Sequence, residues 1–237
     1  DISIYPVGNG SNTFFTKKII KTMVIKNSLP QTIEDLGRGR VLVSSSCNVK
    51  KLLKYCQSRR YDSFYYLASV PATIGGAVAM NAGRGYAHNQ TILDFVQAVT
   101  YVNLSGDIVT IDREKLNSGY RQTMFSESFV GFITSVEFSF GREITEDDPI
   151  AKRIEWSKEY QDYVGGNCGT VFKQCNFRLI RLLMGVKFIN SWYSNKTANW
   201  INNKSESPTG VRLLVMLAKV LHVFSFQKIK LEIRCVR

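Results

Sequence analysis

Two glycine-rich segments in the first half of the chain have residue types that can bind phosphate through the backbone. The first, Gly8-Asn9-Gly10-Ser11-Asn12, directly follows a strand-like run. Glycine has no Cβ, so several backbone N–H groups of such a loop can approach a diphosphate closely. The segment lacks the lysine of a Walker loop and does not open a helix as GxGxxG does. Taken alone, it equally describes an ordinary turn.

The second segment, Pro71-Ala72-Thr73-Ile74-Gly75-Gly76-Ala77, forms a loop that lets either a ligand or a neighbouring strand pack against its backbone. Met80-Asn81-Ala82-Gly83 follows it closely. Each segment is a weak signal in isolation. Their occurrence together in one β-rich half of the chain favours a common ligand.

Net charge and cysteine usage limit the class of partner. With 31 Lys and Arg against 19 Asp and Glu, the formal net charge of +12 fits a nucleic acid, a membrane surface or a phosphorylated small molecule. The basic residues are spread out and lack the interleaved aromatics of a single-strand binder, so we expect no nucleic acid partner. Five cysteines without a CxxC pair and only two histidines give no zinc constellation, so we expect no metal.

The chain opens without a signal-peptide pattern, and its longest apolar run, Val211 to Phe226, is interrupted by Arg212, Lys219 and His222. Such a run is too short and too polar to span a membrane. The hydrophobic share of 44% is that of a packed globular protein. We therefore expect a soluble cytoplasmic protein with reduced thiols, no membrane partner and a monomeric state.

The first part of the chain is predicted to be rich in strands, with one amphipathic helix. The helix fits Asn48–Arg59, with Asn48 as its N-cap and one apolar face formed by Val49, Leu52, Leu53 and Cys56. The predicted strands, each bounded by turn residues, are Ile2–Val7, Val24–Lys26, Arg40–Ser44, Val96–Asn103, Ile108–Ile111 and Phe129–Phe140.

The composition changes near Gly141, and we place a domain boundary after residue 142. Asp148–Gln161 is predicted to be helical, with Pro149 at the first helical position. A loop, Gly165–Thr170, then leads to a short strand, Val171–Lys173. The chain is predicted to end with an amphipathic helix, Pro208 to about His222, whose apolar face holds Val211, Leu214, Val215, Ala218 and Leu221, and a strand, Ile229–Val236.

Several of these segments resemble the motifs of the UDP-N-acetylenolpyruvoylglucosamine reductase family. Ser69–Gly83 resembles its flavin-binding signature, I-P-G-(ST)-(VI)-G-G-A followed by M-N-A-G, and Gly8–Asn12 is similar to its G-G-G-S-N pyrophosphate loop. Four further segments match in the family's order: Ser118–Arg121 (G-Y-R), Asn167–Lys173 (C-G-S-V-F-(KR)), Ser194–Ile201 (S-x-K-H-A-N-F-(IV)) and Leu231–Arg234 (E-V-R). These motifs span nearly the whole chain.

The resemblance implies an α+β protein in two parts. Residues 1–142 would form an FAD-binding domain of the vanillyl-alcohol-oxidase type, and residues 143–237 a smaller α/β substrate-binding lobe. The family has a βαβ unit before its first glycine loop, whereas seven residues precede Gly8 here, so the FAD-binding fold is expected to be N-terminally incomplete.

The implied activity is reduction of UDP-N-acetylglucosamine enolpyruvate to UDP-N-acetylmuramate, a peptidoglycan precursor, with FAD as cofactor and NADPH as reductant. A UDP-sugar would be the partner. The implied cofactor-binding residues are Gly8, Asn9, Gly10, Ser11, Asn12, Pro71, Thr73, Gly75, Gly76, Ala77, Asn81 and Gly83.

Three catalytic residues are implied. Arg121 would hold the substrate carboxylate, because a guanidinium presents a planar fork of donors, although an arginine after a tyrosine is otherwise an ordinary surface residue. Glu232 would help to polarise the developing enolate, the alternative being an exposed strand carboxylate. Thr170 stands where the family has a serine that protonates the carbanion; it keeps the hydroxyl and adds a methyl group.

The implied substrate-binding residues are Tyr120, Lys173, Gln174, Lys196 and Asn199. Gln174 interrupts the family's Lys-Asn-Pro run, and Thr197 replaces its histidine. These departures leave two alternatives open: a non-catalytic homologue that binds flavin or nucleotide, and a flavoenzyme acting on another surface-polysaccharide sugar nucleotide.

Overall fold

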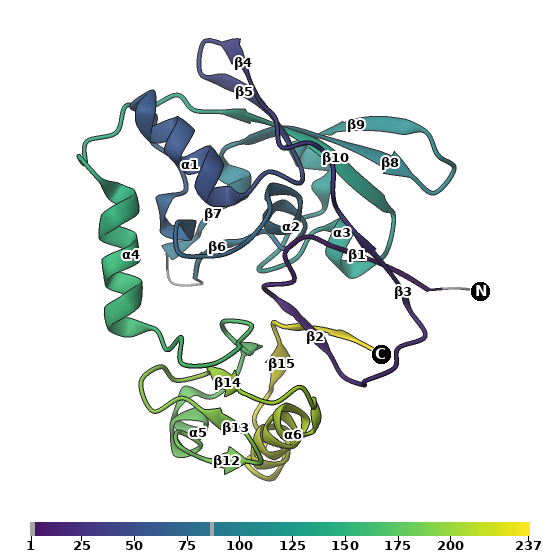
Figure 1. Cartoon of the computed structure of the whole chain (residues 1–237), viewed down its shortest axis with the longest axis vertical. Helices are drawn as coiled ribbons and strands as arrows, with labels where there is room; N and C mark the ends of the chain where they lie inside the picture. Colours follow the sequence, from purple (N-terminus) through teal and green to yellow (C-terminus); the bar gives the residue numbers. More distant parts are fainter. Residues whose placement is uncertain (1–2, 86–87) are drawn as a thin grey trace. The chain divides into compact units, whose positions relative to one another are not determined.

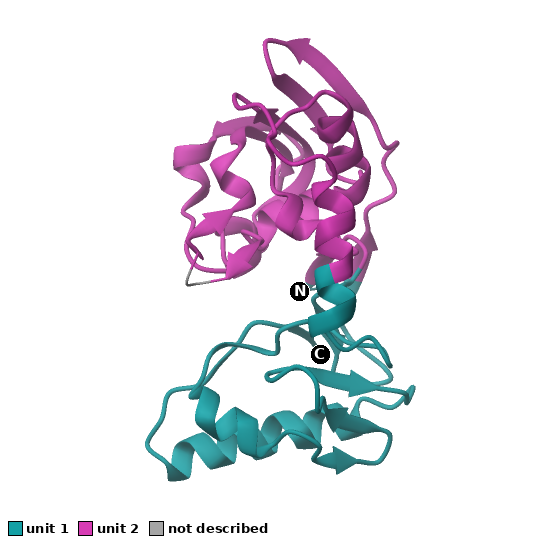
Figure 2. Ribbon diagram, turned by 90° about the vertical axis from the view of Figure 1, so that its left-hand side faces the viewer, with its two compact units in different colours: residues 1–3, 10–23, 156–237 teal, residues 4–9, 24–155 magenta. Residues whose placement is uncertain are grey.

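A computed structural model describes residues 3–85 and 88–237 of the chain. The chain divides into two compact units (Figure 2). Unit 1 comprises residues 1–3, 10–23 and 156–237, and unit 2 comprises residues 4–9 and 24–155. The chain therefore changes unit inside a helix, between residues 155 and 156, and the boundary expected after residue 142 falls within unit 2.

A five-stranded antiparallel sheet in the order β4-β5-β10-β8-β9 forms the centre of unit 2 (Figure 1). Its strands are β4 (Ile33–Gly37), β5 (Arg40–Ser44), β8 (Val96–Asn103), β9 (Ile108–Asp112) and β10 (Gly131–Ser139). In the register, Val136 lies between Val43 and Val99, and all three side chains are fully buried. This row illustrates how period-2 alternation buries one face of each strand.

Helix α1 (Val49–Ser58) contributes its four predicted apolar residues, all fully buried, to the core of unit 2. Asn48 stands at the N-cap position, but its side chain makes no cap hydrogen bond. Its Oδ1 instead accepts a hydrogen bond of 2.9 Å from Nδ2 of Asn9. Asn48 is therefore the N-cap residue, as predicted, but its side chain does not bond the first turn because a side chain distant in sequence engages the cap oxygen.

The segment expected to be a loop around Gly75 is helical, as α2 (Ile74–Ala79). A Cβ on Gly75 would lie 2.8 Å from Cβ of Ser45, so glycine allows this helix to pack directly against the sheet. Thr73 caps α2 by accepting a hydrogen bond of 3.3 Å from the Gly76 N–H. Tertiary packing and this cap outweigh the low helix propensity of two consecutive glycines.

The remaining elements of unit 2 are short. They are β1 (Ile4–Val7), which pairs with β3 (Met23–Lys26), β6 (Gly83–Gly85), which pairs with β7 (Gln90–Thr91), helix α3 (Met124–Glu127), and the 3₁₀ turns Tyr65–Leu67, Ile92–Asp94 and Arg113–Leu116. Helix α4 (Pro149–Tyr160) begins at the predicted proline and passes from unit 2 into unit 1.

Unit 1 has its own apolar core, built on short strands and two helices. Its elements are β2 (Thr13–Phe15), β11 (Phe172–Gln174), α5 (Phe177–Leu182), β12 (Lys187–Phe188), β13 (Ser191–Tyr193), β14 (Ile201–Asn203), α6 (Thr209–Phe224), β15 (Lys230–Leu231) and β16 (Arg234–Val236). β12, β13 and β14 form an antiparallel sheet, β11 pairs with β15, and β2 pairs in parallel with β16.

The pairing of β2 with β16 explains why residues 10–23 belong to unit 1. Thr13 lies opposite Arg234 and Phe15 opposite Val236, at opposite ends of the chain. A shift in composition along the sequence cannot reveal such a pairing. The predicted strand Ile229–Val236 is correspondingly divided in two around Glu232 and Ile233.

No helix in the described part of the chain is both long and apolar enough to cross a membrane.

Candidate functional site

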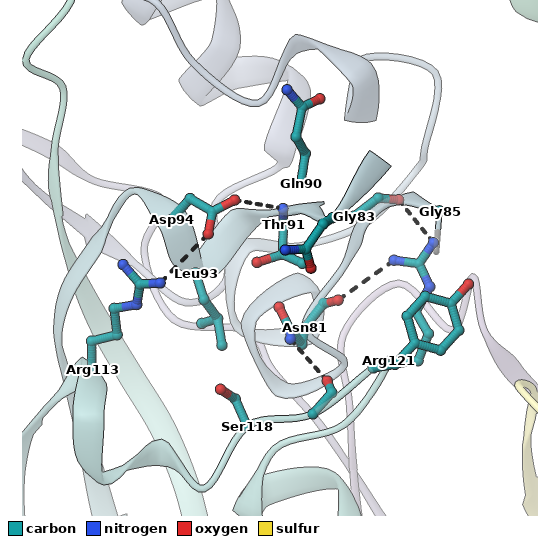
Figure 3. A pocket seen from close by; sticks show the side chains of 13 residues that line it. Asn81, Gly83, Gly85, Gln90, Thr91, Leu93, Asp94, Arg113, Ser118 and Arg121 are labelled. Atoms are coloured by element: carbon teal, nitrogen blue, oxygen red, sulfur yellow. Dashed lines mark hydrogen bonds and ion pairs between the residues drawn. The ribbon is translucent and has the colours of Figure 1, made fainter. Parts of the chain in front are cut away.

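A cavity of about 430 Å³ opens in unit 2 (Figure 3). Three segments line most of it: 81–85 after α2, 89–94 around β7, and 118–121 before α3. Four residues expected from the sequence to bind cofactor or substrate, or to act in catalysis, are among them: Asn81, Gly83, Tyr120 and Arg121. The structure thus brings the flavin signature and the G-Y-R motif together around one space.

The Arg121 side chain is held by the backbone of the flavin signature. Its Nη2 donates a hydrogen bond of 2.8 Å to the Gly83 carbonyl, and its Nη1 lies 3.5 Å from the Asn81 carbonyl (Figure 3). Its guanidinium also lies 5.4 Å from the centre of the Tyr120 ring, within cation–π range. These contacts fix the orientation of the Arg121 guanidinium at the wall of the cavity.

Asn81 presents a buried acceptor to this region. Its Nδ2 donates a hydrogen bond of 2.9 Å to the Gly119 carbonyl, which joins two walls of the cavity. Its Oδ1 is buried and has no hydrogen-bond partner among the described residues. A buried acceptor without a donor is costly, so this oxygen suits a ligand that carries an N–H or O–H group.

Sequence reasoning missed further residues of this region. Asp94 lines the cavity, accepts a hydrogen bond of 2.8 Å from the Thr91 N–H, and pairs with Arg113 at 3.5 Å. The Tyr66 hydroxyl is buried, and burial, followed by the charge of Asp94, raises the pKa of this phenol. No motif pointed to these side chains. Asp94 and Arg113 are identified by their place in the cavity wall, and Tyr66 by the effect of the Asp94 charge on it.

The two glycine segments meet within unit 2. A Cβ on Gly8 would overlap the hydroxyl of Thr73, the residue that caps α2. Only glycine therefore permits the first loop to lie against the start of the second. The two segments are therefore neighbours in the fold of unit 2.

In unit 1, Thr170 and Glu232 are held on one hydrogen-bonded frame. The Val171 carbonyl, directly after Thr170, accepts a hydrogen bond of 2.8 Å from the Glu232 N–H. Asn12 adds a second tie, because its Nδ2 donates to the Glu232 carbonyl at 3.1 Å and its own carbonyl accepts from the Arg234 N–H at 2.9 Å. Thr170 itself is exposed. The last residue of the first glycine loop thus orients the backbone around Glu232, between β15 and β16.

Asn199 fixes the other side of this frame. Its Oδ1 accepts a hydrogen bond of 3.0 Å from the Phe172 N–H, and its Nδ2 donates one of 2.8 Å to the Phe172 carbonyl. The residue is buried and adopts a left-handed backbone with φ of 61°, which asparagine tolerates better than most residues. The amide expected to bind substrate therefore clamps β11.

The segment 194–197 closes the end of α4. Nζ of Lys196 donates to the Lys158 carbonyl at 2.6 Å, and Oγ1 of Thr197 donates to the Tyr160 carbonyl at 2.8 Å. These bonds satisfy carbonyls that a helix C-terminus leaves unpaired, and the ammonium suits the negative end of the helix dipole. Thr197, where the related motif has histidine, thus has a structural use here.

The other expected residues of unit 1 take less distinctive places. Gln174 is exposed and lies opposite Lys230 in the β11–β15 pair, while Lys173 is half-buried. Cys168 donates a weak hydrogen bond from Sγ to the Thr13 carbonyl at 3.4 Å, and burial raises the pKa of its thiol to about 11. At neutral pH this thiol remains protonated.

The expected catalytic residues therefore divide between the units. Arg121 belongs to unit 2, whereas Thr170 and Glu232 belong to unit 1. The Gly8–Asn12 loop also divides, with Gly8 and Asn9 in unit 2 and Gly10, Ser11 and Asn12 in unit 1.

The residues of unit 2 fit a bound flavin dinucleotide by two observations. The unpartnered Oδ1 of Asn81 offers an acceptor beside the cavity, and the Gly8–Thr73 contact brings the two glycine segments close together. Among the described residues, no group of three or more His, Cys, Asp and Glu side chains could hold a metal ion.

Comparison with known proteins agrees with this geometry. Residues 1–112 match the model of the FAD binding domain family. The crystal structure of UDP-N-acetylenolpyruvylglucosamine reductase from Thermus caldophilus superposes with a TM-score of 0.78 at 23% identity, covering 99% of this chain and 86% of that one. The protein therefore has an α+β FAD-binding fold with a smaller lobe.

Two relatives are more similar in sequence. UDP-N-acetylenolpyruvoylglucosamine reductase of Aquifex aeolicus is 32% identical over 211 residues, which cover 86% of this chain and 69% of the relative. The reductase of the same name from Chlamydia felis is 30% identical over 221 residues, covering 90% of this chain and 73% of the relative. The chain belongs to the UDP-N-acetylenolpyruvoylglucosamine reductase family.

Proposed function

We propose that the protein reduces the enolpyruvyl ether of UDP-N-acetylglucosamine to UDP-N-acetylmuramate, a step in peptidoglycan precursor synthesis, with FAD and NADPH. The observation that carries this proposal is the frame of unit 1. The Glu232 N–H donates to the carbonyl of Val171, so the backbone of Glu232 is bonded directly to the residue that follows Thr170. The family's relatives supply the substrate class.

FAD would be held by the two glycine segments and by Asn81, and when bound it supplies the hydride chemistry that links NADPH to the vinyl carbon. Arg121 binds the substrate carboxylate, whose charge grows as the double bond is reduced. The guanidinium needs little reorganisation for this task because Gly83 and Tyr120 already fix its orientation.

Thr170 donates a proton from Oγ1 to the carbon that carries the developing charge. Glu232 stabilises the enolate-like state beside it. Five further residues shape the substrate site: Tyr120, Lys173, Gln174, Lys196 and Asn199. Lys196 and Asn199 act on it indirectly, because their side chains hydrogen-bond to the end of α4 and to β11.

The test is the Thr170→Ala variant. Anaerobic reduction of FAD by NADPH, followed by absorbance, should be unchanged, whereas turnover of the UDP-sugar should fall by about 10²–10⁴-fold, the usual effect of losing a general acid. Thr170→Ser is the matched control and should turn over at the same rate or faster, because it keeps the hydroxyl and removes the methyl group. Equal turnover in the alanine variant would exclude Thr170 from the mechanism.

The proposal places the enzyme in the cytoplasm as a monomer, without nucleic acid. Light scattering of the FAD-loaded protein tests the monomeric state directly.

A further inference from the structure

The outer face of α6 is unusual for a helix that bounds a globular unit. Its exposed positions, which share one stripe at helical spacing, are Thr209, Arg212, Met216, Lys219, Val220, Val223 and Phe224. The opposite face packs Leu214, Ala218 and His222 into the core of unit 1. Apolar side chains thus occupy both faces of the helix, and the outer one is left in solvent.

One more aromatic residue extends this surface at the C-terminal end of α6. Phe226 follows the helix and is 96% exposed, while Phe224 is 79% exposed. We call the stripe together with Phe226 the α6 face.

Every charged residue in the segment that contains α6 and Phe226 is positive. No Asp or Glu occurs from residue 207 to residue 231, whereas Arg212, Lys219, Lys228 and Lys230 do. Unit 1 as a whole has sixteen Lys and Arg against five Asp and Glu, a net charge of +11, whereas unit 2 has fifteen against fourteen. Nearly all of the protein's net charge therefore belongs to the unit that carries this apolar face.

We propose that the α6 face docks onto the surface of an anionic lipid bilayer. Val223, Phe224 and Phe226 enter the boundary between headgroups and acyl chains, and the flanking cations contact lipid phosphates. Helices that lie in the membrane interface combine an apolar face with Lys and Arg in this way. The sequence-based expectation of no membrane partner rested on the lack of a spanning segment, which does not bear on peripheral binding.

Two other occupants fit the α6 face less well. A second copy of the chain would bring two units of +11 together, and like charges oppose such an interface. A nucleic acid would meet aliphatic side chains at the centre of the face, where single-strand binders place stacking aromatics along a basic groove.

The test is sedimentation of the FAD-loaded protein with vesicles of phosphatidylcholine alone or mixed with phosphatidylglycerol. The protein should sediment with the mixed vesicles and remain in solution with the neutral ones. The double variant Val223→Glu, Phe224→Glu should reduce the binding constant about tenfold or more, because it removes apolar contact and adds anionic repulsion. Both positions are exposed, so the thermal unfolding curve should show an intact fold.

A matched control is the double variant Leu104→Glu, Ile108→Glu, which makes the same kind of change at two exposed apolar residues of the β8–β9 hairpin in unit 2. It should bind vesicles as the unaltered protein does. An equal loss of vesicle binding in the α6 variant and in the control variant would indicate adsorption by charge alone and overturn the proposal. The same conclusion would follow if salt abolished vesicle binding of the unaltered protein while the α6 variant bound vesicles as well as the unaltered protein does. Failure to sediment, or a dimer in light scattering that the α6 variant dissociates, would also overturn the proposal.

Discussion

At the scale of single residues, the structure separates side chains that face a ligand from those that hold the backbone. Arg121 and Asn81 lie at the cavity, and Asn81 keeps one buried oxygen without a partner. Asp162, by contrast, acts inside unit 1. Its carboxylate accepts hydrogen bonds from Oγ of Ser194 at 2.7 Å and from the Val164 N–H at 3.1 Å. The same Ser194 hydroxyl receives the backbone N–H groups of Lys196 and Thr197.

Asp162 should make the stability of unit 1 sensitive to acid. Burial raises its pKa, but the hydrogen bonds from Ser194 and Val164 outweigh burial and hold the pKa below the ordinary value of 3.8. A carboxyl whose pKa is lower in the folded state than in the unfolded state stabilises the fold fully at pH values above its unfolded-state pKa. This stabilisation is lost as pH falls through the folded-state pKa. Asp162→Asn should cost about 1–3 kcal/mol near neutral pH.

Urea unfolding at several pH values measures this effect. The difference between Asp162→Asn and the unaltered protein should narrow below pH 3.8. Asp147→Asn, which changes an exposed carboxylate near the start of α4, serves as control and should have little effect at any pH. If the difference in the free energy of unfolding between Asp162→Asn and the unaltered protein did not change with pH, the stabilising role of the Asp162 carboxylate would be contradicted.

Phe226 has a backbone conformation that is unfavourable for a phenylalanine. It directly follows Ser225, the C-cap of α6, with a φ of 52°, a left-handed conformation in which glycine is favoured. Phe226→Gly should raise the free energy of unfolding by about 1 kcal/mol, because an L-residue is strained there. Thermal unfolding gives the measurement. Phe226→Ala keeps the Cβ and should show no such gain; an equal gain in both variants would trace the effect to the exposed ring.

At the scale of elements, short strands in unit 1 depend on side-chain amides for their positions. β11 has only three residues and pairs with a two-residue strand, so its own ladder is brief. Asn199 and Asn12 supply the missing hydrogen bonds from elsewhere in the chain. The loop that carries Thr170 is therefore positioned by residues that need not touch the substrate.

Removing the Asn199 amide should test this dependence. Asn199→Ala leaves the backbone N–H and carbonyl of Phe172 without partners in a buried place, which should cost about 2–4 kcal/mol in the free energy of unfolding. Chemical denaturation followed by circular dichroism measures it. Asn190→Ala, at an exposed site before β13, is the control and should be neutral. A loss of substrate affinity in Asn199→Ala without a loss of stability would instead favour direct binding.

At the scale of the whole molecule, the two units have separate apolar cores. Separate cores allow separate unfolding transitions, because each unit buries its own apolar surface. The family match over residues 1–112 and the cavity both fall mainly in unit 2. FAD should therefore stabilise unit 2 in particular.

Hydrogen exchange with and without FAD distinguishes the units. At a free FAD concentration a hundred times the dissociation constant, amides of β5, β8 and β10 should gain about 2.7 kcal/mol of protection, and those of α6 should gain less. Uridine diphosphate alone is the control and should not protect the sheet of unit 2. An absence of protection by FAD would show that the native chain does not bind the flavin.

The sequence by itself determined the family motifs and part of the regular structure, whereas β4, α5 and the strands β12, β13 and β14 were not predicted. Alternating apolar residues specified β5 and β8 at their observed bounds, and the face of α1 was specified by helical spacing, because these patterns are local. The flavin signature and the motif around Thr170 can likewise be recognised from the sequence alone, because they depend on residue types at fixed spacing. Such local patterns can be predicted from the sequence because the residues that form them lie within a few positions of one another.

Only the tertiary structure decided which of these residues meet. The parallel pairing of β2 with β16, the contact of Gly8 with Thr73, and the clamp of Asn199 on β11 each join residues distant in sequence. The same holds for α2, which forms because Gly75 can lie against Ser45 despite poor helix propensity. Such contacts depend on the burial of surfaces that are shared between elements, and a one-dimensional pattern contains no record of that pairing.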